Sequence, residues 1–368
     1  MANQTIKIRN YGIDLLRLFA MYMVVVLHTM GHGGILDNVK QNTSNYWLAW
    51  FIETAAYCAV DVFAMITGFV MVNSKFNGFK IIPLWLTVFF YSIGISLIFR
   101  FIPQLTAIHN VSIKELFIRC LPISSVQYWY FSRYVGLFFF IPFVNILIKT
   151  LDKKKHGILC LTIIAVYSIF PLFTLNKSDI FSIGDGYSCI WLLCLYIIGA
   201  YFKLYPLEIS KKKCLLFYLV TVILSIGVKF LIQTSSQLLL HKEMEINVFL
   251  GYTNIATIGS AIFLLILFSQ IEIRSSFSQG IITVLGQLAF SVYLIHEQPL
   301  IRDNFIEQKF IDFAMESALI MLIKILSVTV MIFCICLIID LIRFALFKIL
   351  KINSLPKNLL NKFIQKDE

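Results

Sequence analysis

The chain has 368 residues, of which 59% are hydrophobic, 15% are aromatic and only 14% are charged. Soluble domains carry charge on about a quarter of their residues, so this composition excludes a soluble protein and predicts a polytopic membrane protein. The net charge of +11 does not indicate a nucleic-acid partner, because Lys and Arg cluster in short segments between apolar stretches. That pattern is the one that orients a membrane protein.

Apolar windows of about 20 residues, the length that crosses a bilayer as a helix, predict an all-α fold with ten spans. With the N-terminus placed inside, the inner connections hold far more Lys and Arg than the outer ones, so both termini are predicted to be cytoplasmic. Residues 1–368 form one predicted transmembrane domain, which ends in a short basic cytoplasmic tail at 349–368. The predicted spans are 11–30, 47–72, 82–101, 126–148, 157–174, 187–204, 214–233, 247–270, 281–301 and 317–347.

The first span places a cation and an imidazole, Arg17 and His28, inside one apolar stretch. Eleven helical steps of about 100° bring both side chains to nearly one face, about 16 Å apart along the axis. A charge inside a span costs on the order of 2.5 to 3.5 kcal/mol, so this face is expected to contact protein or water rather than lipid. The span also carries Asp14 and lacks a small-residue cleavage site, so it is expected to stay rather than be cleaved as a signal peptide.

Each of these polar residues has two interpretations. An unperturbed imidazole titrates near pH ~6.5, so His28 can act as the general base that acyl transfer to an alcohol requires. The alternative is a polar residue that only helps helices to pack. Arg17 is either the partner of Asp14, three residues earlier, or the ligand of a phosphate or a thioester donor through its guanidinium.

The second span carries a carboxyl group, Asp61, and two small residues, Thr67 and Gly68. Small residues let another helix or a thin ligand approach closely, although packing alone is the simpler role for this pair. Asp61 lies in an apolar run and needs a partner. The partners considered from the sequence are Arg133 and Lys324.

A capping box occurs in the connection between the third and fourth spans, where Ser112 precedes Glu115 by three residues. An apolar run and then Pro122 follow, which predicts a short amphipathic helix on the outer membrane surface. A solvated turn is the alternative.

Two later segments hold further candidate residues. Trp129 and Tyr130 belong to an aromatic cluster that opens the fourth span, which is typical of a membrane interface and also suits the binding of a sugar acceptor. The ninth span ends in His296 and Glu297, at much the same predicted depth as His28.

The eight cysteines lie mostly in apolar runs and lack the doubled C-x-x-C spacing of a structural zinc site. Packing roles are therefore expected, and no metal site is predicted. A disulfide between Cys120 and Cys189, both near the predicted outer side, is the one pairing considered.

Four ordered segments between residues 11 and 302 resemble the acyltransferase-3 family of integral membrane acyltransferases. The first segment contains Arg17 and His28, which are separated by ten residues. The last segment contains Tyr293 and ends at His296, three residues later. The second segment departs from the family pattern at Ala59, Ala64 and Thr67, where Gly, Phe and Ser are usual. The segments are 12–28, 60–69, 129–131 with Pro142, and 290–296.

The resemblance implies a ten-span domain that passes an acyl group, most often acetyl from acetyl-CoA, to a hydroxyl of a glycan or another envelope molecule. It implies catalytic roles for His28, in proton transfer, and for Arg17, in donor binding. The remaining expected donor contacts are Lys75, Lys80 and Thr67, although the lysines lack the bidentate fork of the arginines that the family often has there. The residues expected to bind the acceptor are Trp129, Tyr130, His296 and Glu297.

The predicted function is that of a membrane O-acyltransferase in a bacterial plasma membrane, with an acyl-CoA donor, a glycan or lipid-linked acceptor and membrane lipid as partners. No permanently bound cofactor is expected. A polar cavity is expected to link Arg17 with His28. The alternative is a transporter of a small solute or a lipid-linked glycan, because charges within spans also mark substrate pathways. Broken spans in two matching halves would favour transport, and the sequence has no such symmetry.

Overall fold

The computed structural model describes residues 9–105, 111–173, 179–240 and 250–364. These residues form helices, turns and loops, and no strand occurs among them, which confirms the predicted all-α class. Short 3-10 or π segments connect or extend several helices. The α-helices are α1 (Tyr11–Met30), α2 (Ile35–Asn38), α3 (Ser44–Ala56), α4 (Ala59–Met71), α5 (Ile81–Phe101), α6 (Ile113–Arg119), α7 (Trp129–Thr150), α8 (Lys153–Ile164), α9 (Cys189–Leu204), α10 (Lys211–Leu240), α11 (Ile255–Ser269), α12 (Ser276–His296), α13 (Pro299–Phe305), α14 (Ala318–Ile349) and α15 (Leu355–Ile364).

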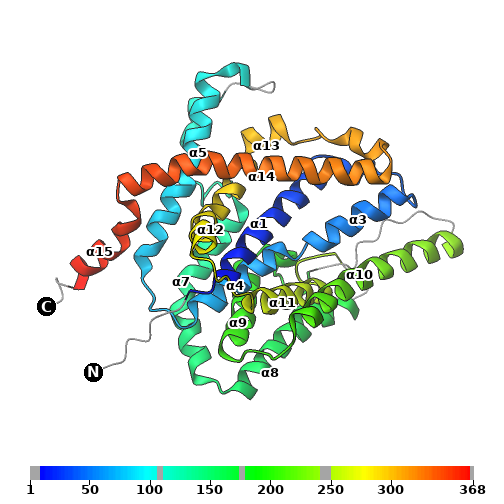
Figure 1. Cartoon of the computed structure of the whole chain (residues 1–368), viewed down its shortest axis with the longest axis horizontal. Helices are drawn as coiled ribbons and strands as arrows, with labels where there is room; N and C mark the ends of the chain where they lie inside the picture. The colour runs from blue at the N-terminus through cyan, green and yellow to red at the C-terminus, as the bar shows by residue number, and fades with distance from the viewer. Residues whose placement is uncertain (1–8, 106–110, 174–178, 241–249, 365–368) are drawn as a thin grey trace.

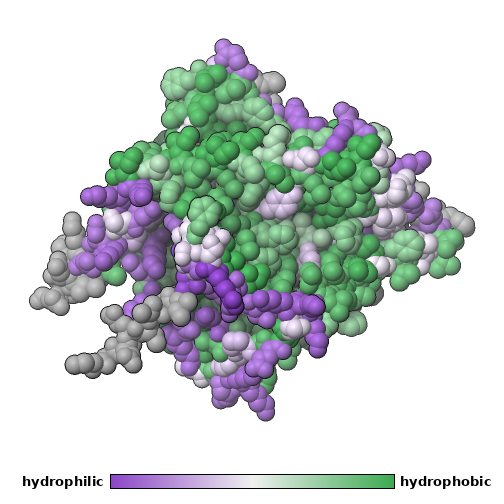
Figure 2. Space-filling model, viewed as in Figure 1, coloured by the Kyte–Doolittle hydropathy of each residue, from purple (hydrophilic) through white to green (hydrophobic). Residues whose placement is uncertain are grey.

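Eight helical segments of the described chain are long and apolar enough to cross a membrane, and α9 and α11 are shorter apolar helices of 16 and 15 residues. One long segment joins α3 and α4 as Ser44–Met71. The ten predicted spans thus correspond to eight full-length segments and two shorter ones, and the chain is a polytopic membrane protein. Figure 2 shows the broad apolar surface over α5 and α14, with hydrophilic residues gathered in the lower part of the view.

Helix α1 lies in the centre of the bundle, where it contacts α3, α4, α11, α12 and α14 (Figure 1). It begins where the Asn10 side chain accepts a hydrogen bond from the Ile13 amide, and it ends at Gly31. Its observed bounds are those predicted. Because protein surrounds the helix, Tyr22 and His28 form hydrogen bonds to α14 and α12, as the cost of placing polar groups in lipid requires.

Helices α1 and α12 run in the same direction along each other. Asp14, near the start of α1, lies against Gly286 in the middle of α12, and near the end of both helices His28 lies against His296. The parallel arrangement therefore brings the two histidines to one depth, as their positions in the predicted spans indicated. We call this the His28 end of the bundle, and the opposite end the Arg17 end.

Helices α4 and α9 approach so closely that two glycines are required between them. A Cβ atom on Gly68 would lie 2.0 Å from the carbonyl oxygen of Tyr196, and one on Gly199 would lie 2.0 Å from that of Met65. The packing role considered for Gly68 is therefore confirmed. This contact fixes α4, which lines the site described below.

We expect Gly68→Ala to destabilise the protein by about 1–3 kcal/mol or more, because the added methyl group must push α4 and α9 apart. The matched control is Gly94→Ala on α5, where an added Cβ would have no neighbour within 4 Å. Thermal unfolding of the purified protein in detergent measures the difference. Equal midpoints for the two variants would contradict the packing role.

The structure also describes the connection that contains Ser112, the cysteines and part of the C-terminal tail. The capping box of Ser112 and Glu115 is present and begins α6, so the predicted short helix is confirmed and the solvated turn is not. All eight cysteines are free, so the disulfide considered between Cys120 and Cys189 is absent. The predicted tail, as far as the structure describes it, contains α15, whose Pro356 carbonyl accepts a 3.2 Å hydrogen bond from the Asn77 side chain.

The partners considered for Asp61 are wrong. Its Oδ1 atom accepts a hydrogen bond from Nε1 of Trp191 at 3.3 Å. Arg133 instead donates to the carbonyl of Tyr187, and Lys324 pairs with Glu316. The error arose because the sequence gives the charge of a buried residue but not which neighbouring helix faces it.

Candidate active site

Two histidines, one from α1 and one from α12, form a hydrogen-bonded pair. Nδ1 of His296 lies 2.6 Å from the carbonyl oxygen of Val292, which can only accept, so Nδ1 carries the proton. In the neutral pair Nε2 of His296 is therefore an acceptor, and Nδ1 of His28, 2.8 Å away, is the donor. It follows that the lone pair of the neutral His28 ring is on Nε2, which is therefore the nitrogen that can accept a proton.

A carboxylate, Glu297, lies directly behind this pair at the end of α12. Its Oε2 atom is 3.1 Å from Nδ1 of His28, and its Oε1 atom accepts a hydrogen bond from Nη1 of Arg302 at 3.0 Å. Burial alone would raise the pKa of Glu297, but the nearby imidazoles of His28 and His32 lower it below its ordinary value. The carboxylate therefore stays ionised and stabilises positive charge on His28.

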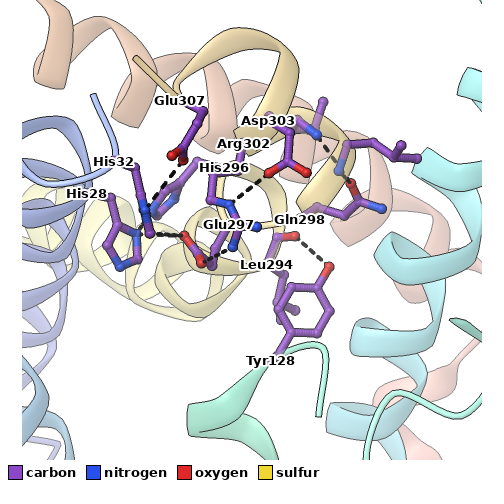
Figure 3. A network of polar contacts seen from close by, with 12 residues as sticks. His28, His32, Tyr128, Leu294, His296, Glu297, Gln298, Arg302, Asp303 and Glu307 are labelled. Atoms are coloured by element: carbon purple, nitrogen blue, oxygen red, sulfur yellow. Dashed lines mark hydrogen bonds and ion pairs between the residues drawn. The ribbon is translucent and has the colours of Figure 1, made fainter. Parts of the chain in front are cut away.

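A third histidine, His32, lies in the turn that follows α1 (Figure 3). Its Nε2 atom is 3.5 Å from Oε2 of Glu297, and its Nδ1 atom is 3.6 Å from Oε2 of Glu307. The backbone holds the turn in place, because the amide of Gln308 donates to the carbonyl of His32 at 2.8 Å. The nearby carboxylate of Glu297 raises the pKa of His32, although burial opposes it.

Sequence reasoning missed His32, Arg302 and Glu307. One signal was present: His32 follows His28 by four residues, about one helical turn, so the two side chains share a face. Arg302 and Glu307 gave no comparable signal, since long-range contacts bring the segment after α12 over the end of α1.

A narrow pocket with a cavity volume of about 40 Å³ opens beside His28. Aliphatic side chains of α1 form one wall. The predicted acceptor residues Trp129 and Tyr130 line the pocket together with His28. The other predicted acceptor residues, His296 and Glu297, contact His28 instead. The remaining aromatic lining is Phe63, Tyr252, Phe290 and Tyr293.

One lining residue offers an unused hydrogen-bond donor. The hydroxyl of Tyr293 is buried and has no hydrogen-bond partner among the described residues. Tyr293 lies on α12 three residues before His296, and its ring centroid is 6.5 Å from that of His28. A buried hydroxyl without a partner is costly unless a ligand supplies one. Thr67, in contrast, already donates its hydroxyl to the Phe63 carbonyl at 3.1 Å.

An aromatic platform lies at the Trp129 side of the pocket. The ring centroids of Trp129 and Tyr187 are 4.5 Å apart, and Tyr252 stacks on Trp129 at 6.0 Å. The three side chains come from α7 and from the segments before α9 and α11. The chain therefore assembles this surface from residues far apart in the sequence.

The predicted donor residues lie elsewhere. Arg17 donates to Asp14 at 2.7 Å, which confirms the intrahelical ion pair, and Arg9 donates to the other carboxylate oxygen at 2.6 Å. Lys75 and Lys80 are exposed near the start of α5. Within the described chain, none of the four predicted donor residues lines the pocket at His28. Their role stays a prediction.

A membrane-spanning helical bundle that places a half-buried base, a carboxylate and a free hydroxyl beside an apolar pocket has the parts of an integral membrane enzyme. The chain matches the model of the acyltransferase-3 family, described as an acyltransferase domain, over residues 10–341. It therefore belongs to this family and is a membrane acyltransferase. No match was found among curated proteins or among solved structures.

Proposed function

We propose that this acyltransferase moves acetyl from cytoplasmic acetyl-CoA to a hydroxyl of a cell-surface polysaccharide or of a lipid-linked glycan precursor, in the plasma membrane of a bacterium. The observation that carries the proposal is the orientation of His28. Its Nδ1 atom is bound by His296, which leaves the Nε2 lone pair for a hydroxyl in the pocket.

In the proposed reaction, Nε2 of His28 takes the proton of the acceptor hydroxyl while the hydroxyl oxygen attacks the thioester carbonyl. The hydroxyl of Tyr293 donates to the oxyanion that forms. When the tetrahedral intermediate collapses, the carbon–sulfur bond breaks, and the thiolate of CoA takes the proton from the imidazolium. Glu297 and His296 stabilise that imidazolium through its Nδ1 atom.

The acceptor is proposed to lie on the aromatic platform. Aromatic rings bind the apolar faces of sugars, and Trp129, Tyr187 and Tyr252 present three rings beside the pocket. A sugar held there would have a hydroxyl within reach of His28, since Trp129 and His28 line the same pocket. The hydroxyl hydrogen bonds that select the glycan would come from the tyrosines.

The donor is proposed to bind from the Arg17 end. The phosphates of acetyl-CoA are attracted by Arg17, Lys75 and Lys80, and the narrow pantetheine arm extends along α1 and α4, past Thr67, toward His28. Arg17 has 30% of its side chain exposed while paired with Asp14, so its guanidinium retains donors for a phosphate.

The function is tested by comparing cells that do and do not express the chain, fed with labelled acetate. We expect expression to increase the alkali-releasable acetate on the envelope glycans. A transporter would change the amount of glycan or solute across the membrane and leave the ester content per glycan unchanged, and that result would overturn the proposal.

Arg17→Lys tests the donor site. We expect the KM for acetyl-CoA to rise about tenfold or more, because a charge-assisted bidentate contact contributes about 1.5–3 kcal/mol and the ammonium of Lys cannot reproduce it. Arg100→Lys is the matched control, since Arg100 bonds to the Val111 carbonyl outside the site. An unchanged KM in Arg17→Lys would remove the donor role.

A further inference from the structure

We propose that the chain binds one divalent transition-metal ion of the zinc type at His28, His32 and Glu297, and that the bound ion stops acyl transfer. The binding site stands on its own geometry. The inhibition rests on the proposed function, because it acts on the base assigned there. The sequence indicated no metal site, since its cysteines lack zinc spacing and His32 was not singled out.

Three ligand atoms converge at this point. Oε2 of Glu297 lies 3.1 Å from Nδ1 of His28 and 3.5 Å from Nε2 of His32, and the three atoms all lie within 4.8 Å of one another. Ligands at about 2.0–2.2 Å from a tetrahedral zinc ion are separated by about 3.3–3.5 Å. Small side-chain movements would thus bring all three atoms to bonding distance.

The environment of the Glu297 carboxylate favours the binding of a cation. Oε2 of Glu297 is buried and has no hydrogen-bond partner among the described residues, although two imidazole nitrogens lie close to it. The other oxygen, Oε1, is occupied by Arg302. A buried acceptor that is held in place but left without a partner is the exception in proteins and indicates a missing ligand.

The surroundings of His32 add a second carboxylate. Nδ1 of His32 faces Oε2 of Glu307 at 3.6 Å, which is the arrangement that orients a metal-binding imidazole and fixes its tautomer. Asp303 accepts from Nε of Arg302 at 2.9 Å and so balances the charge of that arginine. Three carboxylates and one guanidinium therefore face the site, and their net charge favours a divalent cation.

The ligand set selects the kind of metal. Two imidazoles and one carboxylate suit zinc, cobalt or copper ions, whereas magnesium and calcium prefer oxygen ligands. Three protein ligands leave one tetrahedral position open to water. His28 and His32 have 20% and 35% of their side chains exposed, so the site is accessible from the His28 end.

Metal binding and base catalysis exclude each other at His28. A metal ion takes the Nδ1 lone pair, so the proton on Nδ1 leaves to solvent and the hydrogen bond to His296 breaks. The neutral ring then carries a proton on Nε2, taken from solvent, and no proton is gained or lost overall. Nε2 has no lone pair left for the acceptor hydroxyl, so transfer stops.

Binding is tested on the full chain, purified in detergent after chelator treatment. We expect one Zn²⁺ per chain by equilibrium dialysis, and visible absorption bands of tetrahedral Co²⁺ when cobalt is the probe. His32→Ala should weaken binding at least about 100-fold, since one of three ligands is lost. His156→Ala is the matched control, because His156 is a buried histidine that bonds to the Ile197 carbonyl. Absence of bound Zn²⁺, or equal affinity in His32→Ala, would overturn the site.

Inhibition is tested by the ratio of acyl-transfer rates with and without Zn²⁺ in each variant. We expect Zn²⁺ to inhibit the unmodified chain, a chelator to restore the rate, and His32→Ala to require at least about 100-fold more Zn²⁺ for the same inhibition. Stimulation by Zn²⁺, or equal inhibition of both proteins, would overturn the inhibitory role. If no protein transfers acyl groups, the proposed function fails, while the dialysis and absorption results still decide the metal site.

Discussion

Replacing His28 by Ala is expected to lower the acyl-transfer rate about 10²- to 10⁴-fold, the range that a positioned general base contributes. Among the described residues, His28 is the one histidine that lines the pocket, and its lone pair is on Nε2, so no described neighbour is expected to take over its role. His296 cannot replace it, because its Nδ1 proton is bound by Val292 and its Nε2 atom faces α1. Ester-linked acetate on envelope glycans and the rate with purified protein both measure the effect.

The control separates loss of chemistry from loss of folding. His156→Ala also removes a buried histidine, but His156 lies on α8, bonded to the Ile197 carbonyl and away from the pocket. We expect this variant to retain acyl transfer at equal protein level and membrane insertion. Unchanged ester content in an inserted His28→Ala protein would exclude His28 as the base.

Replacing Tyr293 by Phe is expected to lower kcat about 10²- to 10³-fold, with little change in the KM for acetyl-CoA. The substitution removes one hydroxyl from the pocket and keeps the ring. Because that hydroxyl has no partner among the described residues, its removal breaks no internal hydrogen bond. A donor that acts only when negative charge develops affects kcat rather than ground-state binding.

Tyr22→Phe is the matched control for this tyrosine. Its hydroxyl is 2.9 Å from that of Thr329, so the change removes a half-buried, hydrogen-bonded hydroxyl of α1 outside the pocket. We expect a small loss of stability and an unchanged kcat. A higher KM at unchanged kcat in Tyr293→Phe would show that Tyr293 binds a substrate and does not stabilise the oxyanion.

The sequence predicted the spans well where length and polarity both mark a boundary. The first span has the bounds predicted for it, because Asn10 caps its start and three glycines follow its end. Agreement was poorer for α11, which begins at Ile255 although its span was predicted from residue 247. Hydropathy averages over a window and does not detect the Asn254 cap, and residues 247–249 lie outside the described chain.

The site was predicted in part. The shared depth of His28 and His296 followed from their distances to the ends of two parallel spans, and the structure brings them to 2.8 Å. The tautomer of the pair depends on the Val292 carbonyl, and the place of His32 depends on an amide of the segment after α13. Contacts of this kind depend on how distant segments pack against each other. The spacing of residues along a single sequence does not predict that packing.

The pairing of His28 with His296 joins residues 268 positions apart in the chain. During synthesis, α1 enters the membrane long before α12 leaves the ribosome, and until then its imidazole has no partner to hold its orientation. A chain that ends before α12 is therefore expected to lack acyl-transfer activity, because the hydrogen bond that orients the His28 imidazole has not yet formed.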